Sequence, residues 1–355
     1  MQFKIFILLF LLVSTIECSK NSSPNPPPPP AQKDSTFTNP LLSSGPDPWV
    51  IQKDTNYYFT NTFGNKIAIY KTSKMSELKN TSPITIFTPP TTGPYSKDIW
   101  APEIHYLQNK WYVYFAADDG DNANHRIYVL ENASSDPLSG TWTLKGKISD
   151  STNKWAIDAS EFDYNGQEYL IWSGWEGDIN VQQNIYIAKL LNPWTIEGNR
   201  VMISAPTYNW EKVGSSPGTF PTVNEGPEAI ENSSGQLFLT FSASGCWTDG
   251  YCLGLLSLKV GGDPLNAADW TKKSTPVFVT NSTNGAYAPG HNGFFISRDG
   301  TQNWIIYHAN SFANQGCGNS RNPRMQQFTW NTDGSPNFGT PVAISIKITK
   351  PSGEY

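Results

Sequence analysis

Three acidic residues, each just ahead of an aromatic-rich apolar run, are the first candidates for chemistry. Asp47 lies in GPDPWV, Asp158 in WAIDASEF and Glu225 in TVNEGPEAI. Gly226 and Pro227 fix the backbone beside Glu225, so its carboxylate is well placed to project into a cleft. One acid in a turn would be ordinary. Three in the same setting predict one site, able to carry out acid–base catalysis and assembled from distant parts of the chain.

The composition indicates an all-β protein. The chain has 355 residues, of which 15% are charged and 13% aromatic, with 28 Gly and 27 Pro. This balance is typical of many strands joined by turns, with aromatic surfaces left for a ligand. The net charge of −5 and the lack of a basic run argue against a nucleic-acid partner. Sugars fit better.

Residues 1–18 are expected to be a secretion signal. Lys4 precedes the apolar run Ile5–Ile16, which is shorter than the roughly 20 residues of a membrane-spanning helix. Cys18 follows it as in bacterial lipoproteins, which carry lipid on that cysteine, although Glu17 is unusual before such a cysteine. Both a lipid anchor at Cys18 and ordinary secretion therefore stay open, and both place the protein outside the cytoplasm.

Residues 19–38 are expected to form a spacer. Pro26–Pro30 are five consecutive prolines, and such a run adopts an extended polyproline II conformation. This spacer would hold a single catalytic domain, residues 39–350, away from a surface.

A strand-pair motif recurs five times after residue 40, at intervals of roughly 50–65 residues, the size of a four-stranded propeller blade. The first members of the pairs are TNYYFTNT, NKWYVYFAA, GQEYLIWSG, GQLFLTFSA and TQNWIIYHA. The second members are KIAIYKT, RIYVLEN, NIYIAKL, CLGLLSL and RMQQFTW. We therefore expect a single-domain, five-bladed β-propeller.

The innermost strand of each blade lines the central channel of a propeller. In this chain those strands would begin near Asp47, Trp100, Asp158, Glu225 and His291. Four of these five residues are ionisable, at places where a purely structural strand would carry Val or Ile. The pattern predicts that the functional side chains face the channel.

The cysteines after residue 40 are three. Cys246 and Cys252 flank WTDGY, and a local disulfide between them is expected in an oxidising compartment. Cys317 is then left as a free thiol.

The motifs GPDPWV, DIWAPEIH, AIDASEF, VNEGPEA and APGHNGF, in this order, resemble glycoside hydrolase family 43. The resemblance runs from about Asn39 to Lys347. It implies a five-bladed propeller that cleaves α-L-arabinofuranosyl or β-D-xylosyl linkages with inversion, and needs no cofactor. The segments WAPEIH, KWYVYFAA, SGTWT, NEGP, CLGLL and GHN look most like the exo-α-1,5-L-arabinofuranosidase branch.

The resemblance also implies roles for the three acids. Asp47 would be the general base, Glu225 the general acid, and Asp158 a third carboxylate that raises the pKa of the acid and orients it. Glu228 is a rival for the acid role, but the family's acid is the Glu of Glu-Gly-Pro. Glu103 is expected to order the channel wall by hydrogen bonding.

Four further residues are expected to bind substrate. Trp100 would provide an aromatic wall for a sugar. In relatives, an Arg from the strand 321–329 reaches sugar hydroxyls, which favours Arg324 over Arg321. His291 would lie near the axis, either contacting an ion such as calcium through water or serving as a hydrogen-bonded core histidine.

The expected substrates are arabinan, arabino-oligosaccharides or arabinoxylan, and the protein is expected to be a monomer. A β-xylosidase or an arabinoxylan-debranching arabinofuranosidase on the same fold is the nearest alternative. A glycan-binding propeller lectin is the alternative from outside the enzymes, but it would need no acid–base pair.

Overall fold

The computed structural model describes residues 35–354. The expected signal at 1–18, the anchor at Cys18 and most of the spacer lie outside the described residues. A compact unit begins at Ser35, a few residues before the expected start at 39. The reason is that Phe37 is buried in a hydrophobic cluster and belongs to β1 (Thr36–Phe37), which pairs with β22 (Ile348–Thr349) near the end of the chain.

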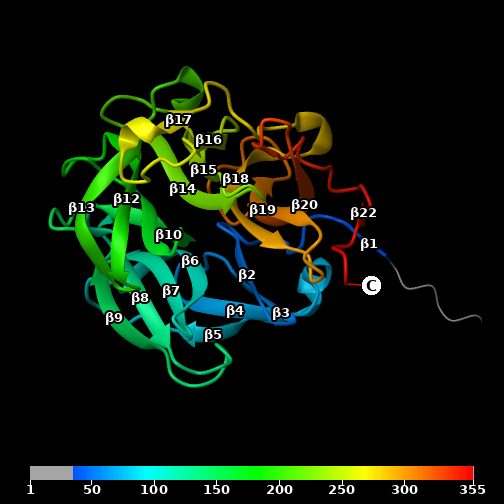
Figure 1. Cartoon of the computed structure of the whole chain (residues 1–355), viewed down its shortest axis with the longest axis horizontal. Coiled ribbons are helices and arrows are strands. Elements are labelled where there is room, and N and C mark those ends of the chain that lie inside the picture. Colours follow the sequence, from blue (N-terminus) through cyan, green and yellow to red (C-terminus); the bar gives the residue numbers. More distant parts are fainter. Residues whose placement is uncertain (1–34, 355) are drawn as a thin grey trace, which may run out of the picture. The chain divides into compact units, whose positions relative to one another are not determined.

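The unit is all-β, and most of its strands form four-stranded antiparallel sheets in chain order (Figure 1). The first sheet contains β2 (Trp49–Lys53), β3 (Asn56–Thr60), β4 (Ile67–Thr72) and β5 (Ile84–Phe87). The second contains β6 (Lys97–Leu107), β7 (Lys110–Asp118), β8 (Arg126–Asn132) and β9 (Thr143–Ile148). The last contains β18 (Tyr287–Ile296), β19 (Asn303–Asn310), β20 (Asn322–Trp330) and β21 (Pro336–Asn337).

An eight-stranded sheet made of two antiparallel groups lies between the second and the last of these sheets in chain order. The first group is β10 (Ala156–Tyr164), β11 (Gln167–Gly174), β12 (Gln182–Asn192) and β13 (Thr195–Ser204). The second is β14 (Thr222–Glu231), β15 (Leu237–Ala243), β16 (Cys252–Leu258) and β17 (Trp270–Lys272). A short parallel pairing joins the groups, Gln182 with Thr222 and Gln183 with Val223.

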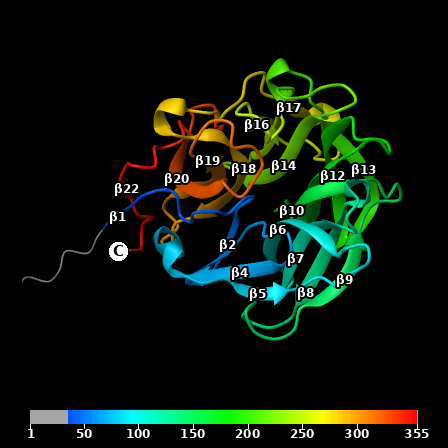
Figure 2. The same cartoon turned by 180° about the vertical axis from the view of Figure 1, so that it is seen from behind.

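The first strand of each group of four lies toward a common centre (Figures 1 and 2). These strands contact one another in a closed ring, in which β2 meets β6, β6 meets β10, β10 meets β14, β14 meets β18, and β18 meets β2. Five short 3-10 helices lie in the connections between strands: η1 (Met75–Asn80), η2 (Asn122–Asn124), η3 (Asn209–Glu211), η4 (Ala267–Asp269) and η5 (Ser282–Asn284).

The start of the folded chain is fastened to the last sheet. The Asn39 side chain donates to Met325 O and accepts from Met325 N, and Leu41 N donates to Pro323 O at 2.8 Å. Gly45 N donates to Arg321 O at 3.0 Å. These bonds bring the segment before β2 alongside the start of β20, and therefore bring Asp47 close to Arg321.

Aromatic and β-branched residues form the second strand of each group of four because both faces of these strands are covered. In β7, for example, eight of the nine residues of KWYVYFAAD are buried. One hydrophobic cluster joins β7 to the first sheet through residues such as Ile69 and Val113, and another joins it to β11 through Tyr114 and Leu170. This burial on both faces replaces the simple polar–apolar alternation of a half-exposed strand.

The predicted Cys246–Cys252 disulfide is wrong. Cys246 is bonded to Cys317, 71 residues away, and Cys252 is a buried free thiol. Cys252 is the first residue of β16 and pairs with Ala243 of β15, whereas Cys246 lies in the loop between these strands and faces another loop. Within residues 35–354, no helix is long and apolar enough to cross a membrane.

Candidate functional site

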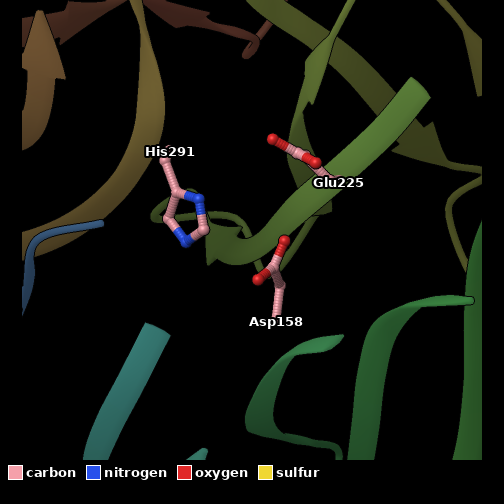
Figure 3. Close-up of side chains that lie close together, drawn as sticks. All are labelled: Asp158, Glu225 and His291. Carbon is pink, nitrogen blue, oxygen red and sulfur yellow. The ribbon is translucent and has the colours of Figure 1, made fainter. Parts of the chain in front are cut away.

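Three inner strands bring Asp158, Glu225 and His291 together. The side chains come from β10, β14 and β18 and point toward one another (Figure 3). One ligand atom from each lies within 4.8 Å of the others. Asp47 joins this group because its Oδ1 lies 3.4 Å from His291 Nδ1. The three predicted acids and His291 therefore form one cluster, in which Asp47, Asp158 and His291 are buried and Glu225 is partly buried; we call it the carboxylate site.

The backbone at this site is unusual. Asp47, Asp158 and His291 have φ values of 54°, 56° and 46°. This left-handed region is unfavourable for residues other than Gly, and such strain is concentrated at functional sites. Strand register also shifts next to Asp158 and between Glu225 and Glu228. These bulges turn individual side chains out of the regular alternation and into the cluster.

Asp47 is held as a carboxylate. Arg321 donates to Asp47 Oδ1 at 2.8 Å, and Asp47 N donates to His308 Nδ1 at 3.1 Å. Burial alone would raise the pKa of Asp47, but the Arg321 guanidinium, His291, His308 and a hydrogen bond from Thr62 together lower it well below its usual range. Asp47 can therefore accept a proton at neutral pH.

Glu225 is shifted in the opposite direction. Burial raises the pKa of Glu225, and the Asp47 carboxylate adds to this, while His291, Arg321 and a 2.8 Å hydrogen bond from the Tyr251 hydroxyl oppose it. Burial also raises the pKa of Tyr251 well above 10, so its hydroxyl stays a neutral donor. Glu225 is thus suited to hold a proton that Asp47 lacks.

Asp158 supports the backbone that carries Glu225. Its Oδ2 accepts a 3.1 Å hydrogen bond from Gly226 N, the amide that follows Glu225. Burial raises the pKa of Asp158 to about 7; His291 opposes the shift, and the carboxylates of Glu225 and Asp47 increase it. The geometry is consistent with an orienting role, which remains a prediction.

A second group of buried ionisable residues lies on the inner strands, and we call it the histidine–glutamate network. His105 Nε2 lies 3.1 Å from Glu103 Oε2, and His105 Nδ1 lies 3.5 Å from Glu161 Oε2. Burial would lower the pKa of His105, but hydrogen bonds to both glutamates raise it to about 9. Glu228, hydrogen-bonded to Glu103 and Ser160, belongs to this group; burial and Glu103 raise its pKa well above the usual value.

The two arginines occupy different environments from those expected. Arg324 is fully buried, and its guanidinium donates to Asn322 Oδ1, to the carbonyls of Gly285 and Asn310, and to the Ser311 hydroxyl. All these partners lie in the last sheet and its loops, whereas Arg321 contacts Asp47. Contact with the three acids is therefore made by Arg321, and a sugar contact by either arginine stays a prediction.

Trp100 lies at the start of β6 and is partly exposed. Its ring stacks on His125 at a centroid distance of 4.0 Å, and the indole packs against a hydrophobic cluster that includes Ile157, the neighbour of Asp158. His125 is in turn paired with the buried Asp118 at 3.0 Å. This position, beside the acids and with a supported ring, is compatible with the sugar wall expected from the sequence; contact with a sugar stays a prediction.

Sequence reasoning missed two supporting residues. Tyr251 precedes Cys252 and gave no motif signal. His308 gave a weak one, because a histidine closes the otherwise apolar run WIIYHA. Their roles can be recognised only in the folded structure, because each forms a hydrogen bond with a residue more than 20 positions away in the chain.

Comparison with known proteins agrees with the family resemblance seen in the sequence. The family described as "Glycosyl hydrolases family 43" matches residues 37–336. An extracellular exo-α-(1→5)-L-arabinofuranosidase of Streptomyces avermitilis is 42% identical over 320 residues, covering 88% of this chain and 65% of that protein. An enzyme of the same name from Streptomyces chartreusis is 36% identical over 287 residues, covering 79% of this chain and 85% of that one.

Among solved structures, the α-L-arabinofuranosidase from Lactobacillus brevis aligns with a TM-score of 0.81 and 35% identity, over 87% of this chain and 98% of that one. The chain spans less than two thirds of the length of the S. avermitilis relative, but it covers nearly the whole of the L. brevis one. The family model matches most of the chain, and the resemblance found in the sequence is confirmed. This chain belongs to the glycosyl hydrolases of family 43.

Proposed function

We propose that this protein hydrolyses α-L-arabinofuranosyl linkages with inversion, with Asp47 as the general base and Glu225 as the general acid. The observation that carries the proposal is that two carboxyl groups of one cluster have different surroundings, a guanidinium contact at Asp47 and a tyrosine hydroxyl at Glu225. Arg321, which donates to Asp47 Oδ1 at 2.8 Å, lowers the pKa of Asp47 and keeps it ionised, while burial raises the pKa of Glu225. Inverting glycosidases need this division of labour between two carboxyl groups.

In the proposed reaction, Asp47 removes a proton from a water molecule while the oxygen of that water attacks the anomeric carbon. Glu225 gives its proton to the glycosidic oxygen on the opposite face as the bond to the leaving group breaks. Asp47 ends protonated and Glu225 ionised, and proton exchange with water restores both. Asp158 would hold the backbone at Gly226 and thereby fix the direction of the Glu225 carboxyl.

The proposed substrate is α-1,5-linked arabinan or its oligosaccharides, attacked from the chain end. Support comes from the two Streptomyces relatives, which are exo-α-(1→5)-L-arabinofuranosidases, and, for the sugar, from the α-L-arabinofuranosidase of L. brevis. A β-xylosidase or an arabinoxylan-debranching arabinofuranosidase would use the same acids and differ in the loops. A lectin has no need of the split pKa values of Asp47 and Glu225, which makes that alternative the weaker one.

We also propose that the groups of four strands are the five blades of a propeller. The closed ring of contacts β2–β6–β10–β14–β18 supports this count, as does the joining of the two middle groups by only a short parallel pairing. The relatives named as extracellular support secretion, and the expected anchor at Cys18 would be an addition to it.

An ion near the axis is a further part of the proposal. Direct binding by Asp158, Glu225 and His291 fits poorly, because Glu225 would have to be ionised and would lose its acid role. An ion contacting His291 through water fits better, since the neighbouring Asn292 has a fully buried amide with no partner among the described residues. Such a cation would supply positive charge beside the three carboxylates.

A product time course on linear α-1,5-arabinan tests the proposal. Arabinose as the sole product from the earliest time points is expected. A ladder of oligosaccharides would keep the acid–base assignment and replace exo by endo action. Cleavage of xylosides alone would overturn the choice of sugar, and binding without cleavage of any glycoside would favour a lectin.

A further inference from the structure

The Cys246–Cys317 disulfide joins two loops that belong to different sheets. Cys246 lies between β15 and β16, and Cys317 lies between β19 and β20. Their Cα atoms are 5.2 Å apart, although 71 residues separate them in the chain. The disulfide therefore fixes the spacing of two segments that no strand pairing holds together.

Each of these loops ends on a side chain that contacts a candidate catalytic carboxylate. Tyr251, five residues after Cys246, donates to Glu225 Oε1 at 2.8 Å. Arg321, four residues after Cys317, donates to Asp47 Oδ1 at 2.8 Å. The disulfide thus connects the loop that carries Tyr251, the partner of Glu225, to the loop that carries Arg321, the partner of Asp47.

Other links between the loops are weak. The Asp249 carboxylate accepts hydrogen bonds from Asn314 N at 2.9 and 3.1 Å, but these groups are on the exposed side. Exposed polar contacts of this kind contribute little to rigidity, because water competes for them. Tyr251 is also held by burial and by stacking on His308 of β19, and the covalent bond is the strongest link between the two loops themselves.

We propose that the Cys246–Cys317 disulfide is a positioning element of the acid–base pair, holding Tyr251 against Glu225 and Arg321 against Asp47. This inference rests on the proposed function, and it concerns two residues outside the reacting groups themselves. It assigns the disulfide a role in turnover in addition to its contribution to stability.

The charged surroundings give the proposal a signed consequence. Asp47 is faced by Arg321, His291 and His308, and Glu225 by His291, Asp47, Arg321, Asp158 and the Tyr251 hydroxyl. The contacts from Arg321 and Tyr251 lower the pKa values of their partners. Loosening both loops therefore raises both pKa values, and moves the acidic and the alkaline limbs of the pH–rate profile to higher pH.

The test compares a C246S/C317S double variant with Cys252→Ala, which removes the buried free thiol and leaves the disulfide. Rates are measured on arabino-oligosaccharides, whose poor leaving group needs the acid, from about pH 2.5 to 9, alongside the thermal midpoint. We expect the double variant to lose about tenfold in kcat, less than the ~100-fold of a 1 Å misplacement. We also expect KM to change less than about twofold and both limbs to move up together.

Reduction of the folded wild-type protein with dithiothreitol should reproduce these changes and should leave the double variant unaffected, which covers the case in which that variant folds poorly. A lower thermal midpoint with an unchanged kcat and pH profile would overturn the proposal and leave the disulfide purely structural.

Failure of the proposed function is a separate outcome. If the wild type cleaves xylosides instead, the same profiles are measured on a xyloside. If it cleaves no glycoside, NMR titration of ¹³C-labelled Asp and Glu carboxyls follows the pKa values of Asp47 and Glu225 without turnover. Identical titrations in the wild type and the double variant would contradict the positioning role.

Discussion

The carboxylate site and the histidine–glutamate network are both buried groups of ionisable residues on the inner strands, yet they balance charge in different ways. In the network, one imidazolium, His105, lies between Glu103 and Glu161, and burial raises the pKa of Glu228. In the carboxylate site, the cationic partner Arg321 contacts only one of the three acids.

This difference separates a structural cluster from a reactive one. A network in which opposite charges are paired has no reason to exchange protons near neutral pH. In the carboxylate site, the pairing with Arg321 lowers the pKa of Asp47 while burial raises that of Glu225, so a base and an acid coexist a few ångströms from His291. Burial alone therefore does not identify catalytic residues; the asymmetry of charge pairing does.

Substitution of Glu225 by Gln should break the carboxylate site most severely. Loss of the transferable proton is expected to lower kcat by about 10²–10⁴-fold on substrates with poor leaving groups. KM should change little, and the thermal midpoint should stay near that of the wild type. Steady-state kinetics on arabino-oligosaccharides measures the loss, and a variant that retains more than half of its turnover would rule out Glu225 as the acid.

Substitution of His105 by Gln should damage the network in stability and leave the chemistry nearly intact. Removing the cation leaves Glu103 and Glu161 unpaired in a buried place, which costs about 3–5 kcal/mol of unfolding free energy. Urea denaturation measures that loss. A kcat reduced as strongly as in the Glu225→Gln variant would show that the two clusters do not act separately.

The same histidine predicts how wild-type stability depends on pH. Because the folded-state pKa of His105 is raised to about 9, its stabilisation is fully present below about 6.5, the unfolded-state value, and is lost as the pH rises toward 9. Unfolding free energies at pH 6.5 and 9 should therefore differ less in His105→Gln than in the wild type. An equal fall in both proteins would contradict the imidazolium assignment.

Substitution of Arg321 by Ala should reduce the difference between the pKa values of Asp47 and Glu225 without abolishing it. The pKa of Asp47 rises when the guanidinium is removed, so the acidic limb of kcat/KM moves to higher pH, by about one unit or more. At a pH on that limb, about tenfold in rate is lost, with less effect above it. Arg321→Lys keeps the charge and should fall between Ala and the wild type, which the pH–rate profiles of the three proteins would reveal.

Substitution of Glu228 by Gln should have the smallest effect. Burial and Glu103 raise the pKa of Glu228 and so favour its neutral form, and a neutral amide of similar shape can donate the same hydrogen bond to Glu103. We expect less than about 1 kcal/mol of destabilisation and less than about a twofold change in kcat. The same substitution at Glu225, three residues away on β14, is the matched comparison; a large kcat loss at Glu228 would reopen its candidacy as the acid.

Much of the molecule was predictable from local patterns. The repeated apolar runs located β3, β7, β11, β15 and β19, and the acids ahead of the runs located Asp47, Asp158 and Glu225 at the inner strands. These features depend on turn residues and strand-length apolar segments, which are local properties of a sequence.

Partners across the fold were harder to predict. Arg321 and Arg324 are three residues apart, and nothing in their local sequence says that β20 begins at Asn322, leaving one arginine in a loop beside Asp47 and the other inside the last sheet. The disulfide prediction was wrong for the same reason, because proximity in sequence favoured Cys252 over Cys317 as the partner of Cys246.

The sequence by itself determined the all-β class, the family, and the three acids with their order along the chain, because each is written in a short motif or a repeat. The tertiary structure decided which groups surround those acids: Arg321 against Asp47, Tyr251 against Glu225, and the disulfide between their loops. Electrostatic environment depends on distances of a few ångströms between residues up to 274 positions apart, and only the closed arrangement of the sheets fixes such distances.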